Sequence, residues 1–153
     1  MDVDLVVALT QADVEPFLDH LGERFYADEE TLRSAIRARS SVNLIHRESS
    51  TKVDLFILGG TPVDDEQMER RVRLQVASAP DSFLYVYAAE DILLQKLRWY
   101  RLGNEVSDRQ WRDILGIIGV QGGRLDLSYL RRGAITLGVT DLLDKALGEV
   151  QER

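Results

Sequence analysis

The chain lacks cysteine altogether, and no apolar run is long enough to span a membrane. The absence of cysteine excludes a disulfide framework and thiolate chemistry, and it is compatible with the cytoplasm. A membrane-spanning helix needs about 20 consecutive apolar residues, so we expect no such helix. The N-terminus shows no basic segment followed by the apolar core of a signal peptide. We therefore expect a cytoplasmic protein that does not associate with a membrane.

The chain also has fewer basic than acidic residues, 19 against 26, so its net charge is −7. This balance argues against a broad nucleic-acid-binding face, although it leaves room for a local basic patch. A negative chain is also suited to holding cations. The length of 153 residues is sufficient for one domain with a substantial core.

The first nine residues, 1–9, form an apolar and β-prone run that is interrupted by Asp2 and Asp4. Side chains alternate along a strand, so both carboxylates project to one face. Beyond them this face continues with Val6 and Ala8, which makes both faces apolar. The pattern predicts a central strand that is buried on both sides and carries two acids at its solvent end.

A second apolar run, 52–58, carries Asp54 near its start. If the two strands are neighbours, about 4.8 Å apart, then Asp2, Asp4 and Asp54 converge. Such a group of hard carboxylate oxygens suits Mg²⁺ or Mn²⁺ together with the phosphates of a substrate. The alternative is that these are solvated acids at strand ends. We expect Lys52 to project to the opposite face from Asp54.

The remaining pattern predicts strands in the first half of the chain and helices in the last third. Strands are expected at 41–46, 52–58, 71–77 and 83–87. Helices are expected after Thr10, where Pro16 requires a late start or a kink, and over 28–39, 64–70, 90–102, 107–118, 126–137 and 140–147. We therefore predict an α+β fold with a mixed β-sheet flanked by helices. Residues 1–88 would form the sheet core and residues 89–153 a helical part packed on it as one compact unit.

The acid motifs and their order resemble a known superfamily. The segment Asp2-Val3-Asp4-Leu5-Val6, followed by Lys52-Val53-Asp54-Leu55-Phe56, is similar to the polymerase-β-type nucleotidyltransferases, in particular the bacterial minimal and abortive-infection (AbiEii-like) proteins. Segment 90–97 resembles the next helix of those proteins, which carries a lysine that faces the nucleotide. Segment 108–114 resembles their following helix, which contains Arg-Asp. The resemblance covers residues 2–147.

The resemblance implies a sheet of the nucleotidyltransferase type and Mg²⁺-dependent transfer of a nucleoside monophosphate from an NTP to a protein, RNA or small-molecule acceptor. Asp2, Asp4 and Asp54 would bind the metal, and Asp54 would also help to activate the acceptor hydroxyl. Lys96 would contact phosphate, and Asp108 and Asp113 would position the nucleotide. For Lys96, the alternative is a surface lysine whose aliphatic stem lies along apolar side chains. For Asp108 and Asp113, the alternative is a favourable interaction with the helix dipole.

One departure from the superfamily concerns the phosphate cradle, a Gly-Gly or Gly-Ser turn that opens a helix before the Asp-x-Asp strand. This chain has no residues for it before Asp2, and Gly59-Gly60 and Gly122-Gly123 lie in other places. We therefore expect weak or absent transfer, and an exposed apolar patch that favours homo-oligomers. A rival reading is a degenerate binding partner in a toxin–antitoxin-like or regulatory assembly. A metal-dependent phosphohydrolase is a third reading, for which the sequence names no base.

Overall fold

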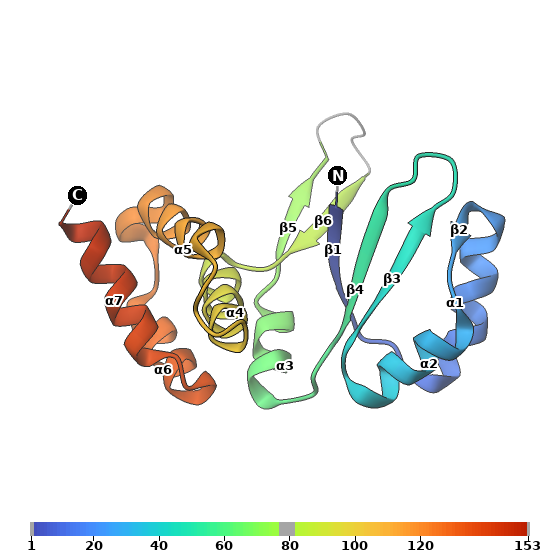
Figure 1. The fold of residues 1–153 in the computed structure, drawn as a ribbon, viewed down its shortest axis with the longest axis horizontal. Helices are drawn as coiled ribbons and strands as arrows, with labels where there is room; N and C mark the ends of the chain where they lie inside the picture. The colour runs from blue at the N-terminus through green and yellow to red at the C-terminus, as the bar shows by residue number, and fades with distance from the viewer. Residues whose placement is uncertain (1, 77–81, 153) are drawn as a thin grey trace. The chain divides into compact units, whose positions relative to one another are not determined.

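The computed structural model describes residues 2–76 and 82–152, and for Asp2 it describes the backbone only (Figure 1). The chain divides into two compact units, residues 1–64 and residues 65–153, each with a hydrophobic core of its own. Among the described residues, neither core includes a residue of the other unit. Each unit therefore buries its own apolar side chains.

The first unit is a four-stranded mixed sheet with two helices on one face (Figure 1). The strands, in their order across the sheet, are β1 (Asp2–Val7), β4 (Lys52–Ile57), β3 (Ser41–His46) and β2 (Phe25–Tyr26). Only β1 and β4 run parallel, and the other pairs are antiparallel. Helices α1 (Val14–Leu21) and α2 (Glu29–Ala38) bury their apolar sides against this sheet. The predicted α+β class with a mixed sheet is confirmed.

Local signals define the ends of the two helices. The Asp28 carboxylate accepts a hydrogen bond from the backbone N–H of Thr31 at 2.7 Å, which caps α2. A short 3-10 turn follows Thr10, and the α-helix proper begins only at Val14. Pro16 consequently lies in the first turn, where its missing N–H breaks no helical hydrogen bond. Of the two possibilities left open by the sequence, the late start is correct.

Strand β1 departs from the prediction, because it lies at the edge of the sheet and not in its centre. Its apolar residues Val3 and Leu5 are 37% and 44% exposed. The prediction of a strand buried on both faces was therefore wrong. Apolar residues on both faces of a strand are compatible with burial of both faces. They do not determine whether the strand has a neighbour on each side or lies at the edge of the sheet.

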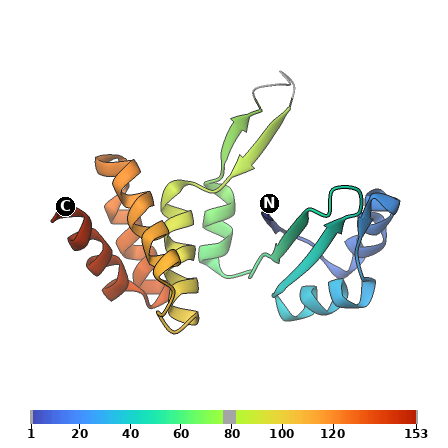
Figure 2. The same cartoon turned by 45° about the horizontal axis from the view of Figure 1, so that its top comes forward.

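The second unit combines a β-hairpin with a helical bundle (Figure 2). The hairpin consists of β5 (Val72–Gln75) and β6 (Phe83–Val86), which form a separate two-stranded sheet. The bundle helices are α4 (Ala89–Leu102), α5 (Asp108–Gln121), α6 (Leu127–Leu137) and α7 (Thr140–Gln151). A further helix, α3 (Pro62–Glu69), spans the division between the units. The chain thus divides after Asp64, whereas the sequence suggested a boundary after residue 88. The boundary lies earlier because β5 and β6 pair with each other and do not join the four-stranded sheet. The predicted end of its first strand, Ala77, lies outside the described residues.

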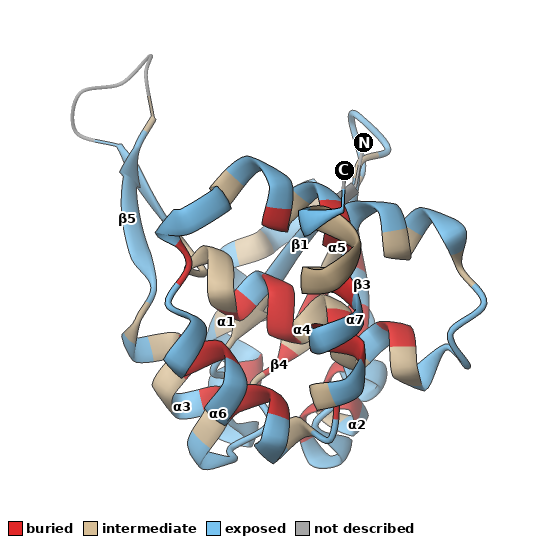
Figure 3. Cartoon of the chain, turned by 90° about the vertical axis from the view of Figure 1, so that its left-hand side faces the viewer, coloured by how far each residue is buried: buried red, intermediate tan, exposed pale blue. Residues whose placement is uncertain are grey.

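Buried positions recur along the bundle helices (Figure 3), and the apolar ones form one hydrophobic cluster. Leu93, Leu97 and Tyr100 of α4 are buried, as their spacing predicts. Capping follows the sequence too, because Ser107 accepts from the N–H of Gln110 and Asp126 from that of Tyr129. No helix in the described ranges combines the length and apolar character that a membrane crossing requires.

Candidate functional site

The predicted pairing of the two acid-bearing strands is present in the first unit. Strand β1 runs parallel to β4, and the register places Asp4 opposite Asp54 and Asp2 opposite Lys52. Residues directly opposite each other on paired strands project to the same face. The sheet therefore brings Asp4 and Asp54 together on one face. The side chain of Asp2, the third predicted ligand, lies outside the described part of the chain.

This face is the one that α1 and α2 leave uncovered. Val53 and Leu55, the sequence neighbours of Asp54, pack into the core under these helices. Because side chains alternate, Asp54 points to the opposite side of the sheet. Asp4 is exposed there, whereas the Asp54 side chain is only 18% exposed. The two carboxylates are thus in different environments, and that of Asp54 is largely withdrawn from water.

The two oxygens of the Asp54 carboxylate are used differently. Oδ2 accepts a hydrogen bond from Lys52 Nζ at 3.0 Å, within an ion pair. Oδ1 is buried and has no hydrogen-bond partner among the described residues. A buried carboxylate oxygen without a partner loses its hydration free energy without compensation. A cation at Oδ1 would compensate for this loss.

The position of Lys52 corrects a prediction. The sequence pattern was expected to place its side chain on the face opposite Asp54, but the two side chains form an ion pair on one face. The physical reason is that residues two apart on a strand share a face, so the alternation in fact puts Lys52 beside Asp54. Lys52 is therefore part of the candidate site and must be considered wherever a cation is proposed to bind Asp54.

Asn43 is a further neighbour, which the sequence reasoning did not single out. In the antiparallel pair of β3 and β4 it lies opposite Asp54, so it shares the carboxylate face. Asn43 is exposed, and its amide oxygen is a hard ligand of the kind that Mg²⁺ accepts. The sequence of β3 did contain a signal for Asn43. Its neighbours Val42 and Leu44 are apolar and pack into the core, so the polar residue between them projects to the other face.

These residues suit a divalent cation in chemical type. Asp4, Asp54 and Asn43 occupy one row across three strands and offer only oxygen ligands. Among the side chains that the structure describes, no three acids or histidines lie close enough to hold one ion, and that set does not include Asp2. Asp4 and Asp54 would therefore need Asp2, Asn43, water or substrate phosphate to complete a coordination shell.

Lys96 and Asp113 line a groove in the second unit. Lys96 Nζ donates to Asp113 Oδ2 at 3.1 Å, which joins α4 to α5. The groove has a volume of about 420 Å³, and apart from Gln121 its other lining residues are apolar or small: Ala89, Ile92, Gly116, Ile117 and Val120. Lys96 is thus paired with an acid, and its contact with phosphate stays a prediction. Asp108 is exposed in the first turn of α5, where the helix dipole favours a carboxylate.

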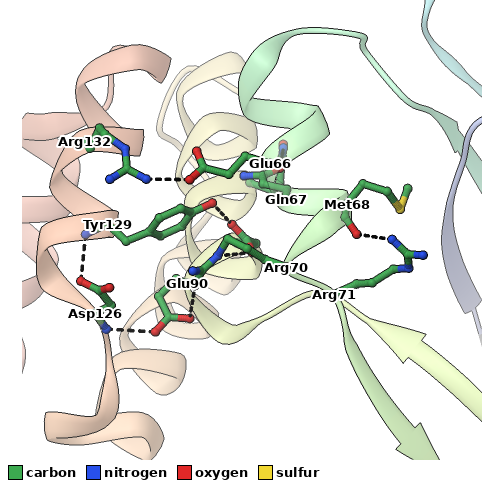
Figure 4. Close-up of polar contacts among 11 residues, drawn as sticks. Glu66, Gln67, Met68, Arg70, Arg71, Glu90, Asp126, Tyr129 and Arg132 are labelled. Carbon is green, nitrogen blue, oxygen red and sulfur yellow. Dashed lines mark hydrogen bonds and ion pairs between the residues drawn. The ribbon is translucent and has the colours of Figure 1, made fainter.

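A buried polar cluster in the second unit was missed by the sequence reasoning (Figure 4). Tyr129 of α6 donates its hydroxyl to Asp91 Oδ1 of α4 at 2.5 Å, and Asp91 is fully buried. The guanidinium of Arg70, just beyond α3, lies 3.8 Å from the centre of the Tyr129 ring and forms an ion pair with Asp91. Burial raises the pKa of the Asp91 carboxyl, and burial with the Asp91 hydrogen bond raises the pKa of Tyr129.

Further contacts around this cluster fasten the end of α3 to the bundle. Glu66 forms an ion pair with Arg132 of α6 at 2.6 Å, and the buried Gln67 accepts from Gln95 Nε2 at 2.7 Å. Glu90 accepts a hydrogen bond from the backbone N–H of Asp126 at 2.9 Å (Figure 4). No local sequence signal could have found this cluster, because its partners lie 20 to 66 residues apart in the chain. We assign it a role in holding the elements of the second unit together.

No protein-family model, no curated protein and no solved structure matches this chain. The resemblance to nucleotidyltransferases therefore depends on the two acid-bearing strand motifs and the helices that follow them in the sequence.

Proposed function

We propose that the chain is a nucleotidyltransferase-like protein that transfers a nucleoside monophosphate from an NTP to an acceptor, with release of pyrophosphate and with the weak activity that the sequence leads us to expect, in a reaction that depends on Mg²⁺ or Mn²⁺. The acceptor is a protein, an RNA or a small molecule. The single observation that carries the proposal is the pairing of Asp4 with Asp54, together with the buried, unpartnered Oδ1 of Asp54. Acids that are merely solvated at strand ends would keep both oxygens in water.

The free-energy cost of this arrangement supports a role beyond solubility. Leaving a buried acceptor without a partner costs about 1–3 kcal/mol, and more when the group is charged. Lys52 offsets part of this cost at Oδ2 but not at Oδ1. A divalent cation held by Asp54 and Asp4 would stabilise both carboxylates, which otherwise repel each other across the strand pair.

Each residue would have a defined task in the reaction. Asp4 and Asp54, with Asp2, would hold the cation, which when bound supplies charge neutralisation for the phosphates. Asp54 would also help to activate the attacking hydroxyl, as the resemblance implies. Lys96, Asp108 and Asp113 belong to the second unit, and their contacts with phosphate and nucleotide depend on the resemblance alone.

The proposal is tested first by nucleotide binding. Any ligand that binds only the folded chain raises its melting temperature, so NTP with Mg²⁺ should stabilise the wild type. The variant Asp54→Asn should lose this stabilisation. Asp19→Asn removes an exposed carboxylate on α1 and serves as the matched control, which should retain it.

Transfer is measured in the same variants by incorporation of radiolabel from α-labelled NTPs into the chain itself or into added RNA. Incorporation that requires Asp54 but not Asp19 would support the proposal. If neither the melting temperature nor incorporation differs between Asp54→Asn and Asp19→Asn, the proposed function is wrong. A chain that no NTP stabilises would instead fit the non-catalytic binding partner.

A further inference from the structure

The hairpin β5–β6 exposes several large apolar and aromatic side chains. Leu74 is 50% exposed, Leu84 61%, Phe83 41% and Tyr85 54%. A two-stranded hairpin is at best marginally stable in water by itself, so exposed rings and leucines on it need a reason. The strand residues Val72–Gln75 and Phe83–Val86 include no acid, although the chain as a whole has a net charge of −7.

The register sorts these side chains onto two faces of different chemistry. Arg73 lies opposite Tyr85, and Gln75 opposite Phe83, so arginine and aromatic rings share one face. The other face is aliphatic, with Leu74 opposite Leu84 and Val72 opposite Val86. We call the first of these the arginine–aromatic face, made of Arg71, Arg73, Phe83 and Tyr85.

Arginine and aromatic groups are stacked on this face before any partner binds. The Arg73 guanidinium lies 3.8 Å from the centre of the Phe83 ring, and that of Arg71 lies 4.8 Å from the Tyr85 ring. The two rings meet edge to face at 5.5 Å. Arg71 also donates to the Met68 carbonyl oxygen at 2.5 Å. Side chains ordered in this way lose little conformational entropy when a ligand binds.

We propose that the arginine–aromatic face binds single-stranded nucleic acid. Guanidinium groups pair with phosphate oxygens through two parallel hydrogen bonds, and exposed rings and guanidinium planes stack on unpaired bases. A hollow of about 280 Å³, lined by Arg73, Gln75, Ser82 and Phe83, adds polar groups beside the ring. This inference goes beyond the proposed function, which leaves the acceptor open, and it does not depend on the metal site.

Other occupants fit the face less well. An acidic protein segment would use the two arginines but would leave Phe83 and Tyr85 without a matching surface. A duplex hides its bases from stacking, so the rings favour a single strand. A second copy of this chain is acidic overall and would be attracted to the arginines. Self-association would, however, bury the aliphatic face of Leu74 and Leu84 and not the arginine–aromatic face.

The test is fluorescence anisotropy with the full chain and labelled single-stranded oligonucleotides of about 12 nucleotides, within the usual site size. The double variant Arg71→Ala/Arg73→Ala should weaken binding at least about tenfold. The slope of the logarithm of the binding constant against the logarithm of the salt concentration should become less steep by about 0.7 for each phosphate that is no longer neutralised. Tyr85→Leu keeps apolar bulk but removes the ring. It should weaken binding about fivefold or more with the salt slope unchanged.

The matched control removes the same charge elsewhere. Arg37 on α2 and Arg131 on α6 are exposed, so Arg37→Ala/Arg131→Ala should change the affinity by no more than about twofold. Circular dichroism and thermal unfolding establish that every variant is folded. Arg73→Lys, which keeps the charge but not the planar group, should bind with intermediate affinity.

Several results would overturn the proposal. One is the absence of binding by the wild type at low salt, and another is an equally weakened affinity in the control. If heparin displaces the oligonucleotide and Tyr85→Leu has no effect, the attraction is to polyanions in general and the proposal fails. It also fails if the hairpin instead mediates self-association that Leu74→Lys abolishes.

Discussion

At the scale of single residues, Lys52 is the side chain that most changes the view of the candidate metal site. Its ammonium occupies Oδ2 of Asp54, the same carboxylate whose Oδ1 is buried and unpartnered. A cation that binds Asp54 must therefore share the group with a fixed positive charge. Because Lys52 is about half exposed, water screens this repulsion, and its effect on binding is modest.

The variant Lys52→Gln should accordingly bind Mn²⁺ more tightly than the wild type. Exposed ion pairs contribute up to about 1 kcal/mol, which corresponds to a dissociation constant lower by about two- to fivefold. Arg37→Gln removes an exposed positive charge on α2 and should leave the constant unchanged. Tighter binding in both variants would mean that only the net charge matters. Weaker binding in Lys52→Gln would contradict the arrangement.

Asp91 gives a prediction for the dependence of stability on pH. Burial raises the pKa of its carboxyl above the ordinary value of 3.8, so the folded state holds this proton more tightly than the unfolded state does. The stabilisation is complete below about pH 3.8 and is lost as the pH rises through the folded-state pKa.

Urea denaturation of the wild type and Asp91→Asn tests this prediction, because asparagine still accepts the Tyr129 hydrogen bond and does not titrate. The free energy of unfolding of the wild type, minus that of the variant, should fall as the pH rises from about 3.5 to about 7. A difference that rises over this range would show that Arg70 lowers the pKa of Asp91 more than burial raises it.

At the scale of elements, α6 approaches α4 closely at Gly133. A Cβ atom there would lie 2.5 Å from Leu94 Cδ1, and Leu94 is fully buried. Alanine favours a helix over glycine by about 1 kcal/mol, whereas overpacking a core costs about 1–3 kcal/mol. The steric clash should prevail over the helix propensity.

Gly133→Ala is therefore expected to lower the free energy of unfolding by about 1 kcal/mol. Gly119 of α5 is the matched control, because a Cβ there meets nothing within 4 Å. Gly119→Ala should stabilise the chain by about 0.5–1 kcal/mol, as measured by urea denaturation. A stabilising effect of both substitutions would show that α4 and α6 separate easily at this point.

The elements also show how far the sequence could predict the structure. The helix starts at residues 28 and 107 were correctly predicted, because Asp28 and Ser107 cap these helices and a cap is an interaction over three residues that can be recognised in the sequence. The neighbours β1 and β4 were correctly paired. The edge position of β1 was not predicted, because it depends on which distant segments are available to pair.

The same limit applied to the site. The alternation of side chains predicted that Asp4 and Asp54 share a face, and it should also have placed Lys52 beside them. The buried pair of Asp91 and Tyr129 could not be anticipated, because 38 residues separate its members and neither has a local signature. Contacts of this kind follow only from the three-dimensional packing of α4 against α6.

At the scale of the whole molecule, two separate cores predict two units of stability. Leu55 lies in the core of the sheet unit and Leu130 in that of the bundle, and both are essentially buried. Truncation of a buried leucine to alanine costs about 2–5 kcal/mol. Units with separate cores should lose protection from hydrogen exchange separately.

Hydrogen exchange measured by mass spectrometry tests this expectation. Leu130→Ala should speed amide exchange in α4 to α7 and leave β3 and β4 protected, and Leu55→Ala should do the reverse. If either substitution accelerates exchange equally in both units, the chain unfolds as one cooperative body. The division at Asp64 would then have no thermodynamic meaning.

The most direct test of the proposed metal site is Mn²⁺ binding, followed by electron paramagnetic resonance, in the wild type, Asp54→Asn and the control Asp19→Asn. We predict that the wild type and the control bind Mn²⁺ alike. Asp54→Asn should bind at least about tenfold more weakly, because the largely buried carboxylate is gone. Equal binding by all three proteins would contradict a metal site at Asp4 and Asp54.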